Sequence, residues 1–393
     1  MQQMPIERTC PFSPPPEYAR LRAETPIAKV GLPRGEAWAI STHEGVRQML
    51  TDPKFSSSRQ NPKFPLLVDA PPPPDDFKPS LIVMDPPQHG PARRAVLGEF
   101  TLKRINAMRP RIQQIVDDCL DEMLSGPKPT DLVAALSLPV PSLVICDLLG
   151  VPYADHEFFQ TNSHKMVGYS VDPHERMAAI GELRNYLDDL VSGKEAQPTD
   201  DLLGRQILKQ REAGTADHDD LVGLAFLLLV AGHETSANMI SLGTLALLEN
   251  PEQLDVIRND PSKTPGAVEE LLRYFTIAES AALRVAVEDT EIGGTVIHAG
   301  EAVIGLTQAA NRDPQVFDDP DTLNVERSAR GHLAFGFGAH QCLGQNLARL
   351  ELQIVFDALV SRVPGLALAT SPDKLSFKND ASIYGLYELP VTW

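Results

Sequence analysis

The chain has 393 residues, 42% of them hydrophobic, so it can bury a large core and has room for two or three domains of ordinary size. Its formal net charge of −18 argues against nonspecific nucleic-acid binding through a basic surface. The four cysteines form no CxxC pair, which argues against a zinc site or a disulfide scaffold and favours a reducing compartment.

The first ninety residues alternate short elements with loops. The spacing of apolar residues predicts a helix over 17–25, and the turn residues that follow predict a β-hairpin over 27–41. Thr42 is expected to cap a helix that runs to residue 50. Prolines exclude a helix between residues 62 and 87, so we expect an extended loop there. At the N-terminus no basic segment precedes an apolar one, which argues against a signal peptide or an anchor.

Helical periodicity dominates the rest of the chain. The most apolar run, residues 221–231, is too short to cross a bilayer and is expected to lie in a buried helix of a cytoplasmic protein. Short strands are expected within 284–304 and near the C-terminus, with irregular chain over 311–332. The pattern predicts a mostly α fold with small peripheral β-sheets. The expected helices cover residues 91–98, 105–124, 131–149, 154–168, 173–193, 200–212, 218–249, 251–258, 264–275 and 343–361.

One cysteine, Cys342, follows a glycine-rich run and precedes a leucine-rich helical pattern. The run is Phe335-Gly336-Phe337-Gly338-Ala339-His340-Gln341-Cys342-Leu343-Gly344. At the start of a helix, free backbone N–H groups and the helix dipole favour a thiolate, and a thiolate is a good ligand for iron. Taken alone, a lone cysteine is more often a small buried hydrophobic residue.

A second motif lies inside the longest apolar helix, at Ala231-Gly232-His233-Glu234-Thr235. Glycine in a helix interior costs about 1 kcal/mol relative to alanine, so Gly232 requires a reason. Thr235 can donate a hydrogen bond to the carbonyl four residues earlier and bend the helix, which would open a groove beside Ala231 and Gly232. The alternative is a glycine packing site followed by polar residues.

Two further features are ambiguous by themselves. Glu270 and Arg273 are three residues apart and therefore share a helix face, but an exposed pair of this kind contributes only a few tenths of a kcal/mol. A basic cluster lies between residues 93 and 111, with Glu99 as its only acid. It is either a solvated helix surface or a docking site for an acidic partner.

Together these motifs resemble those of the cytochromes P450. Residues 335–344 match the haem loop Phe-Gly-x-Gly-x-His-x-Cys-x-Gly, and residues 231–235 resemble the oxygen-binding helix Ala-Gly-x-Glu/Asp-Thr. Glu270 and Arg273 stand where the family has its ExxR motif. The matching motifs run from residue 84 to about 349 and are most similar to soluble bacterial class I hydroxylases of macrolides, secosteroids, statins and xenobiotics. The resemblance implies a single P450 domain over residues 1–393.

The resemblance implies a haem b cofactor, buried between the long central helix and the cysteine loop with its helix, and O2 as co-substrate. Haem carries two propionates, which require cationic anchors from separate segments. Carried over residue by residue, the cofactor site comprises Cys342 as iron ligand with His89, Arg93, Arg284, His340, Phe335, Gly336 and Gly344 around the porphyrin.

The implied activity is that of a monooxygenase (EC 1.14), which inserts one oxygen atom of O2 into a C–H bond of a fairly large apolar molecule. By resemblance, Gly232 and Ala231 leave room for dioxygen. Thr235 hydrogen-bonds at the oxygen site, and Glu234 delivers protons with ordered water. The family network of buried charges is matched by Glu270, Arg273 and Arg327.

Partners and pocket follow from the same resemblance. Electrons are expected from a separate ferredoxin and its reductase, docked at Arg94, Lys103, Arg104, Arg109 and Arg111, since no reductase domain is evident. We expect a monomer that binds neither nucleic acid nor membrane. An apolar substrate pocket is expected at Leu66, Val68, Ile82, Val83, Met166, Val167, Leu227, Leu228, Ile277, Ala278, Ser280, Ala281, Ile383 and Tyr384.

Three alternatives stand beside this hypothesis. One is a peroxygenase or nitric oxide reductase of P450 fold, and Glu234 beside Thr235 argues against it because those enzymes commonly lack the acid. Another is a non-catalytic haem-binding sensor or carrier, which would not need a proton-delivery pair. The last is a helical protein without haem, in which Cys342 is merely buried.

Overall fold

The computed structural model describes residues 2–67, 78–167 and 171–393. The chain forms two compact units, the first made of Met1–Ala92 and Pro265–Gln345 and the second of Arg93–Thr264 and Asn346–Trp393. Each unit joins chain segments that are distant in sequence. The expectation of a single domain over residues 1–393 therefore remains a prediction, and the units are described one at a time.

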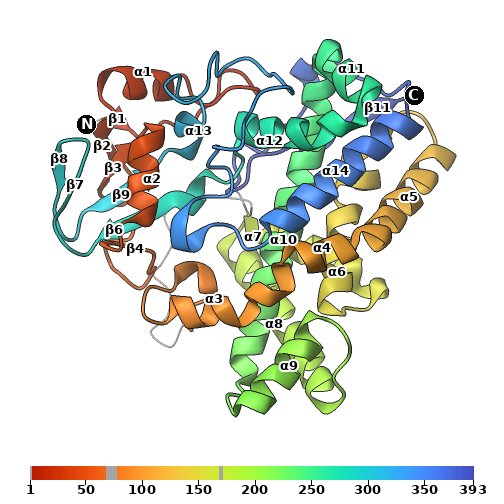
Figure 1. Ribbon diagram of the computed structural model, residues 1–393, viewed down its shortest axis with the longest axis horizontal. Coiled ribbons are helices and arrows are strands. Elements are labelled where there is room, and N and C mark those ends of the chain that lie inside the picture. The colour runs from red at the N-terminus through yellow and green to blue at the C-terminus, as the bar shows by residue number, and fades with distance from the viewer. Residues whose placement is uncertain (1, 68–77, 168–170) are drawn as a thin grey trace. The chain divides into compact units, whose positions relative to one another are not determined.

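The first unit is built on a six-stranded mixed sheet with the strand order β1-β2-β3-β9-β6-β4 (Figure 1). The predicted hairpin over 27–41 is confirmed, since β2 and β3 pair antiparallel from Ile27 opposite Ile40 to Gly31 opposite Glu36. Strand β9 pairs parallel to β3 and antiparallel to β6. The strands, with the separate β7–β8 hairpin, are β1 (Gln2–Gln3), β2 (Ile27–Gly31), β3 (Glu36–Ile40), β4 (Phe55–Ser56), β6 (Leu283–Ala286), β7 (Thr290–Ile292), β8 (Thr295–Ile297) and β9 (Ala302–Gly305).

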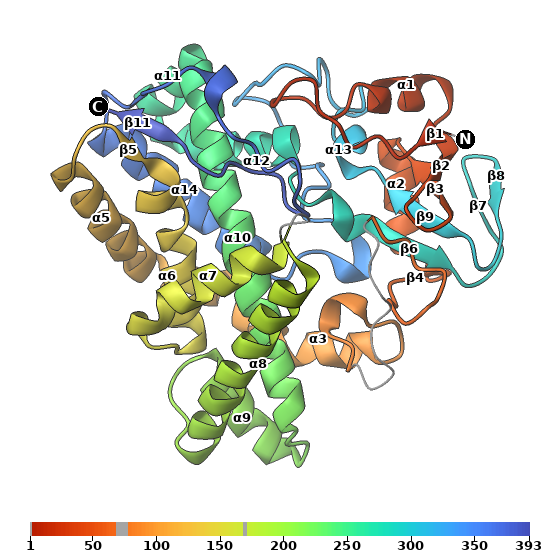
Figure 2. The ribbon, with the colours of Figure 1, turned by 180° about the vertical axis from the view of Figure 1, so that it is seen from behind.

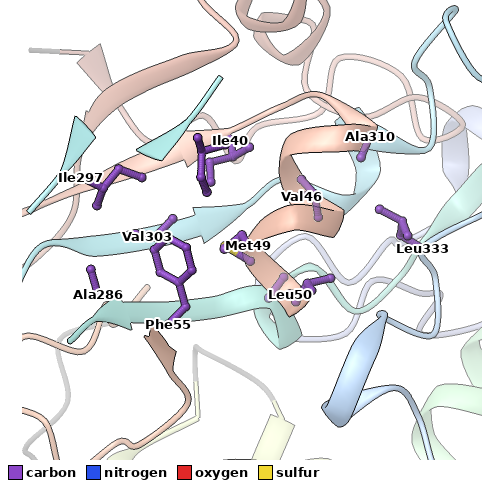
Figure 3. Packing of buried hydrophobic residues seen from close by; sticks show 12 residues of the cluster. Ile40, Val46, Met49, Leu50, Phe55, Ala286, Ile297, Val303, Ala310 and Leu333 are labelled. Atoms are coloured by element: carbon purple, nitrogen blue, oxygen red, sulfur yellow. The ribbon is translucent and has the colours of Figure 1, made fainter. Parts of the chain in front are cut away.

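Helix α2 (His43–Thr51) packs its apolar face on this sheet (Figure 3). Thr42 caps it as predicted, because its hydroxyl oxygen accepts a hydrogen bond from the Gly45 N–H at 3.2 Å. Met49 of the helix and Ile40 of the sheet belong to one buried cluster. Burial of a side chain of that size stabilises the fold by about 1.5–3 kcal/mol. The remaining helices that begin in or belong to this unit are α1 (Glu17–Glu24), α3 (His89–Leu97), α12 (Thr264–Phe275) and α13 (Thr307–Ala310).

The second unit is helical and is organised around α10 (His218–Glu249), against which α6 and α8 pack (Figure 2). A three-stranded sheet, ordered β10-β11-β5, lies at its edge. The predicted mostly α fold with small sheets is thus confirmed. The other elements are α4 (Leu102–Ala107), α5 (Arg109–Ser125), α6 (Pro139–Leu149), α7 (His156–Val167), α8 (Pro173–Ala196), α9 (Leu202–Ala213), α11 (Pro251–Asn259), α14 (Gln345–Arg362), β5 (Thr130–Asp131), β10 (Ala367–Leu368) and β11 (Pro390–Thr392).

Prolines account for the places where the expected helices were too long. The helix expected over 105–124 is divided at Met108, and Pro110 occupies the first turn of α5, where its missing N–H costs nothing. The helix expected over 131–149 is a π-helical turn at Val133–Ser137 followed by α6, which starts at Pro139. The expected loop over 62–87 contains a short 3-10 turn at Leu81–Val83, and its residues 68–77 lie outside the described residues.

Helix α10 contains the apolar run over 221–231 and extends it to 32 residues. Within the described residues, this one helix is long and apolar enough to cross a membrane, a test that the buried core helix of a soluble protein also passes. Residues along most of its length, from Leu221 to Leu247, are buried in the second unit. Packing against α6 and α8 thus accounts for the apolar character that the sequence shows.

Candidate active site

The loop before Cys342 belongs to the first unit and is shaped by two glycines. Gly336 and Gly338 have φ of +67° and +73°, a conformation that disfavours side chains. A Cβ at Gly338 would also lie 2.7 Å from the carbonyl oxygen of Leu50. The loop closes where the Cys342 N–H donates to the Phe335 carbonyl at 2.8 Å. Cys342 is therefore held three residues before α14, at the start of a helix as the sequence predicted.

The thiol of Cys342 is partly exposed, whereas two other cysteines are buried. Burial, with nearby carboxylates, raises the pKa of Cys119 to about 11 and that of Cys146 to about 12. Both side chains are therefore thiols at neutral pH and are poor metal ligands. Cys10 is partly exposed like Cys342, so it is the loop geometry that singles out Cys342 as the candidate ligand.

Two histidines of the first unit meet beside this loop. The rings of His89 on α3 and His340 stack at 4.1 Å between centroids, with 28° between their planes. Sequence reasoning placed both at the cofactor, and the structure brings them together although they are far apart in the chain. Arg93 lies one helical turn after His89 on α3 and is half-buried.

Arg284, on β6, carries a buried charge that no carboxylate of the described residues neutralises directly. Its side chain is 6% exposed and donates to the carbonyls of Leu283 at 2.7 Å and Ala281 at 3.4 Å. Burial lowers the pKa of Arg284 to about 10, and Asp85 only partly opposes that effect. Among the described residues, none forms an ion pair with this guanidinium. A buried cation in this state fits a propionate, so the residues present are suited to haem.

The motif on α10 lies in the second unit. The Thr235 hydroxyl donates to the Ala231 carbonyl at 2.9 Å, the bond that the sequence suggested, although α10 continues through it as an α-helix. A Cβ at Gly232 would lie 3.0 Å from Cδ1 of Ile145 on α6. The structure thus gives Gly232 a packing reason at the crossing of α6 and α10, and room for dioxygen at this glycine stays a prediction.

Glu234 has a partner that the sequence did not reveal. Its carboxylate is 2% exposed and accepts a hydrogen bond from the Lys378 ammonium at 2.7 Å. The Asn238 side chain donates to the same oxygen at 3.2 Å and to the Glu234 carbonyl at 2.8 Å. Burial by itself would raise the pKa of Glu234, but the charges of Lys378 and His233 and these hydrogen bonds outweigh it and lower the pKa.

A second acid lies close to the motif. Glu351 on α14 is 1% exposed and hydrogen-bonds Ser236, the residue after Thr235. Burial raises its pKa to about 8, and its Oε2 has no partner among the described residues. Glu351 is therefore largely protonated at neutral pH, in contrast to Glu234. Its position in a helix of ordinary composition gave no signal in the sequence.

The expected network of buried charges is present in the first unit. Arg273 donates to Glu270 through Nε at 2.7 Å and Nη2 at 2.8 Å, and both side chains are fully buried. Arg327 Nε donates to the same carboxylate at 3.2 Å. Arg273 also donates to the carbonyls of Asn311 and Pro320, each at 2.8 Å. This network joins α12 to the irregular segment that precedes the cysteine loop.

Comparison with known proteins agrees with these features. The family model "Cytochrome P450" matches residues 16–364, and the "Vitamin D3 dihydroxylase" of Streptomyces griseolus is 48% identical over 391 residues, covering 99% of this chain and 96% of that protein. The chain belongs to the cytochrome P450 family. It is accordingly a P450 monooxygenase whose cofactor is haem-thiolate iron and whose co-substrate is O2.

Solved P450 structures match the chain over its whole length. Cytochrome P450 MoxA of Nonomuraea recticatena, a CYP105 protein, has a TM-score of 0.94 at 57% identity and covers 100% of this chain and 98% of its own. The mycinamicin VIII C21 methyl hydroxylase MycCI of Micromonospora griseorubida has a TM-score of 0.95 at 41% identity, with 100% of both chains covered. The fold expected from the motifs is confirmed.

The basic cluster of this P450 is exposed but less basic than its sequence suggests. Nε of Arg104 lies 3.4 Å from Oε2 of Glu99, the acid within the cluster. Arg111 pairs at 3.0 Å with Asp147, which α6 brings from outside the cluster. The members exposed on the second unit are Arg94, Lys103, Arg104, Arg109 and Arg111.

The residues expected to line the substrate pocket are divided between the two units. In the first unit, Val83 and Ile277 are buried, while Ile82 is 52% exposed and Leu66, Ala278 and Ala281 are at least partly exposed. In the second, Leu228 and Tyr384 are buried, and Met166, Leu227 and Ile383 are partly exposed. Val68 lies outside the described residues, and the side chains of Val167 and Ser280 lie outside them as well.

Proposed function

We propose that this P450 hydroxylates a bulky, largely apolar small molecule of the macrolide, secosteroid, statin or drug-like class. The observation that carries the monooxygenase reaction is Glu234 beside Thr235 on α10, an acid and a hydroxyl where O2 reduction needs protons. The substrate class is supported by the names of similar enzymes, a vitamin D3 dihydroxylase and a mycinamicin hydroxylase. The apolar composition of the expected pocket agrees with such a substrate.

The first unit supplies the proposed ligand and anchors of the cofactor. The Cys342 thiolate would bind the iron, and the glycines of its loop would leave room for the porphyrin beside the backbone. At Gly344, an added Cβ would meet no described residue within 4 Å, so that position leaves open space. Arg284 would neutralise one propionate, and His89 with His340 would hydrogen-bond the propionates. When bound, the haem supplies O–O cleavage and the oxidation of the C–H bond.

The second unit supplies the proposed proton chemistry. Thr235 has its hydroxyl oriented by the Ala231 carbonyl, so an oxygen lone pair remains available to a water molecule or to a reacting oxygen atom. Glu234 passes protons toward the hydroxyl of Thr235 through ordered water, while Ala231 and Gly232 keep side chains small there. Glu270, Arg273 and Arg327 act structurally, by fixing the segment that leads to the cysteine loop.

We infer that electrons come from a ferredoxin-type protein and its reductase. Arg94 and Lys103 are exposed, and among the described residues no ion pair of either is found, so their charges are available to an acidic partner. We place the protein in the cytoplasm as a monomer that binds neither membrane nor nucleic acid. This placement is supported by the absence of disulfides among the described residues, by the buried apolar faces of α10 and by the net charge of −18.

The test begins with the carbon monoxide difference spectrum of the reduced holoenzyme, in wild type and in C342S. We expect the band of thiolate-ligated haem in wild type and its loss in C342S. Candidate substrates are then screened by the spin-state shift of the ferric enzyme, and those that bind are incubated with ferredoxin, reductase and O2. Oxidation driven by peroxide alone and not by the electron donor would refute the monooxygenase proposal in favour of a peroxygenase.

A further inference from the structure

The lysine that pairs with Glu234 belongs to a hairpin near the C-terminus, residues 377–386. Phe377 and Leu386 form an antiparallel bridge, and the Lys378 N–H donates to the Gly385 carbonyl at 2.9 Å. The rings of Phe377 and Tyr384 stack with 7° between their planes and 6.0 Å between centroids. The hairpin thus has its own backbone pairing and its own packing, which fix the direction of the Lys378 side chain.

This hairpin is anchored on α10 at the turn that follows Glu234. A Cβ at Gly385 would lie 1.7 Å from Oδ1 of Asn238, so the backbone of the hairpin approaches α10 as closely as glycine permits. Asn238 in turn donates to both the side chain and the carbonyl of Glu234. The hairpin, the amide and the acid therefore form one connected arrangement.

The Lys378–Glu234 pair is buried on both sides, with side chains 4% and 2% exposed. A buried pair is held firmly, because separating it would leave an unpaired charge in a poorly solvated place. Other titratable groups near the pair are His233 on α10 and, on the hairpin side, Tyr387 and Asp380. The Lys378 ammonium lies 5.8 Å from the centre of the Tyr387 ring, whose hydroxyl donates to Asp380 at 2.7 Å.

We propose that Lys378 is a positioning residue for the reaction: through the C-terminal hairpin it holds Glu234 as an anion beside Asn238 and sets when this acid can take up and pass on a proton. This proposal rests on the role given to Glu234 under the proposed function. Glu234 paired with Lys378 has no proton to give. It must first leave the ammonium and take a proton from water, which it then passes on, so that one solvent proton is consumed and Lys378 keeps its charge throughout.

The hairpin also carries Ile383 and Tyr384, which were expected at the substrate. A substrate that presses on these residues would act on the same short segment as Lys378, only five and six positions away.

The test uses the holoenzyme with K378M, K378Q and K378R, and K194M as a matched control. Lys194 forms a comparable buried pair with Asp201, both side chains 8% exposed, and it has no part in the proposed chemistry. Infrared difference spectra of the ferric enzyme against pH detect the protonated carboxyl of Glu234, identified by its loss in E234Q. We expect this band at neutral pH in K378M and K378Q, and its absence in wild type, K378R and K194M.

The second measurement is the coupling, which is the amount of product formed per electron pair consumed. Electron pairs that form no product appear as peroxide. We expect K378M and K378Q to lose this coupling by on the order of 10- to 100-fold, and K378R to retain most of it. An unchanged infrared titration in K378Q or K378M overturns the proposal, as does a loss of coupling in K194M equal to theirs. If wild type oxidises no substrate, the proposed function fails, and the infrared titration still tests Lys378 by itself.

Discussion

Replacement of Glu351 by glutamine should remove a pH-dependent loss of stability that is built into α14. The pKa of this fully buried acid is raised from its ordinary value of 4.5 to about 8. Between these values the unfolded chain has released the proton, whereas the folded protein keeps it. The free energy of unfolding contributed by this group therefore falls by about 1.4 kcal/mol for each pH unit, and by about 5 kcal/mol over the whole interval.

Glutamine has nearly the same shape, carries no titrating proton and can still hydrogen-bond Ser236. The unfolding free energy of E351Q should therefore exceed that of wild type by an amount that grows from about pH 4.5 to about pH 8 and then levels off. Below pH 4.5 the acid is protonated in both states, so the two proteins should differ little there.

The assay is urea denaturation of the holoenzyme, followed by far-ultraviolet circular dichroism at closely spaced pH values from 5 to 8, a range set by the shift of Glu351. A conservative control is E99Q, which changes an acid whose buried carboxylate is paired with Arg205 at 2.9 Å. That variant should lose stability at every pH. Curves for E351Q and wild type that run parallel across the range would refute the argument, since Glu351 would then not titrate between them.

Three further predictions concern other parts of the chain. G338A should lose more stability than G35A. Both positions have positive φ, which costs a residue with a side chain about 1–2 kcal/mol, but only at Gly338 would the added Cβ also lie against a backbone carbonyl. Equal losses of stability, measured by thermal denaturation, would contradict this. R273M should cost about 3–5 kcal/mol by leaving buried Glu270 with Arg327 alone as its cationic partner, and the double variant R273M/E270Q should recover part of it, measured by denaturant unfolding. K103E should slow association with a ferredoxin at low salt and not at high salt, measured by stopped-flow reduction.

Much of the fold could be predicted because its signals are local. The helix over 218–249 and the helix over 264–275 have the bounds that apolar periodicity predicted. The errors arose where two helical segments follow one another directly, as at Met108, because periodicity does not register a short change of direction. There the proline in the next turn was the available signal.

Short motifs in the sequence specify the residue types that the proposed chemistry needs. Each of these motifs involves only neighbours within a few residues. They are a cysteine after two glycines, an acid beside a threonine in an apolar helix, and the spacing of Glu270 and Arg273. Local geometry therefore follows from local sequence, and the resemblance to the P450 family followed from the order of these motifs.

The electrostatic state of these groups depends instead on tertiary packing. Glu234 and Lys378 are 144 residues apart, and no pattern in either segment indicates the other. Likewise, Glu351 and Arg284 are ordinary charged residues until burial removes the water around them. The protonation state of a side chain is set by its solvation and by partners within a few ångströms. Both are properties of the packed chain, because folding brings together segments that are far apart in the sequence.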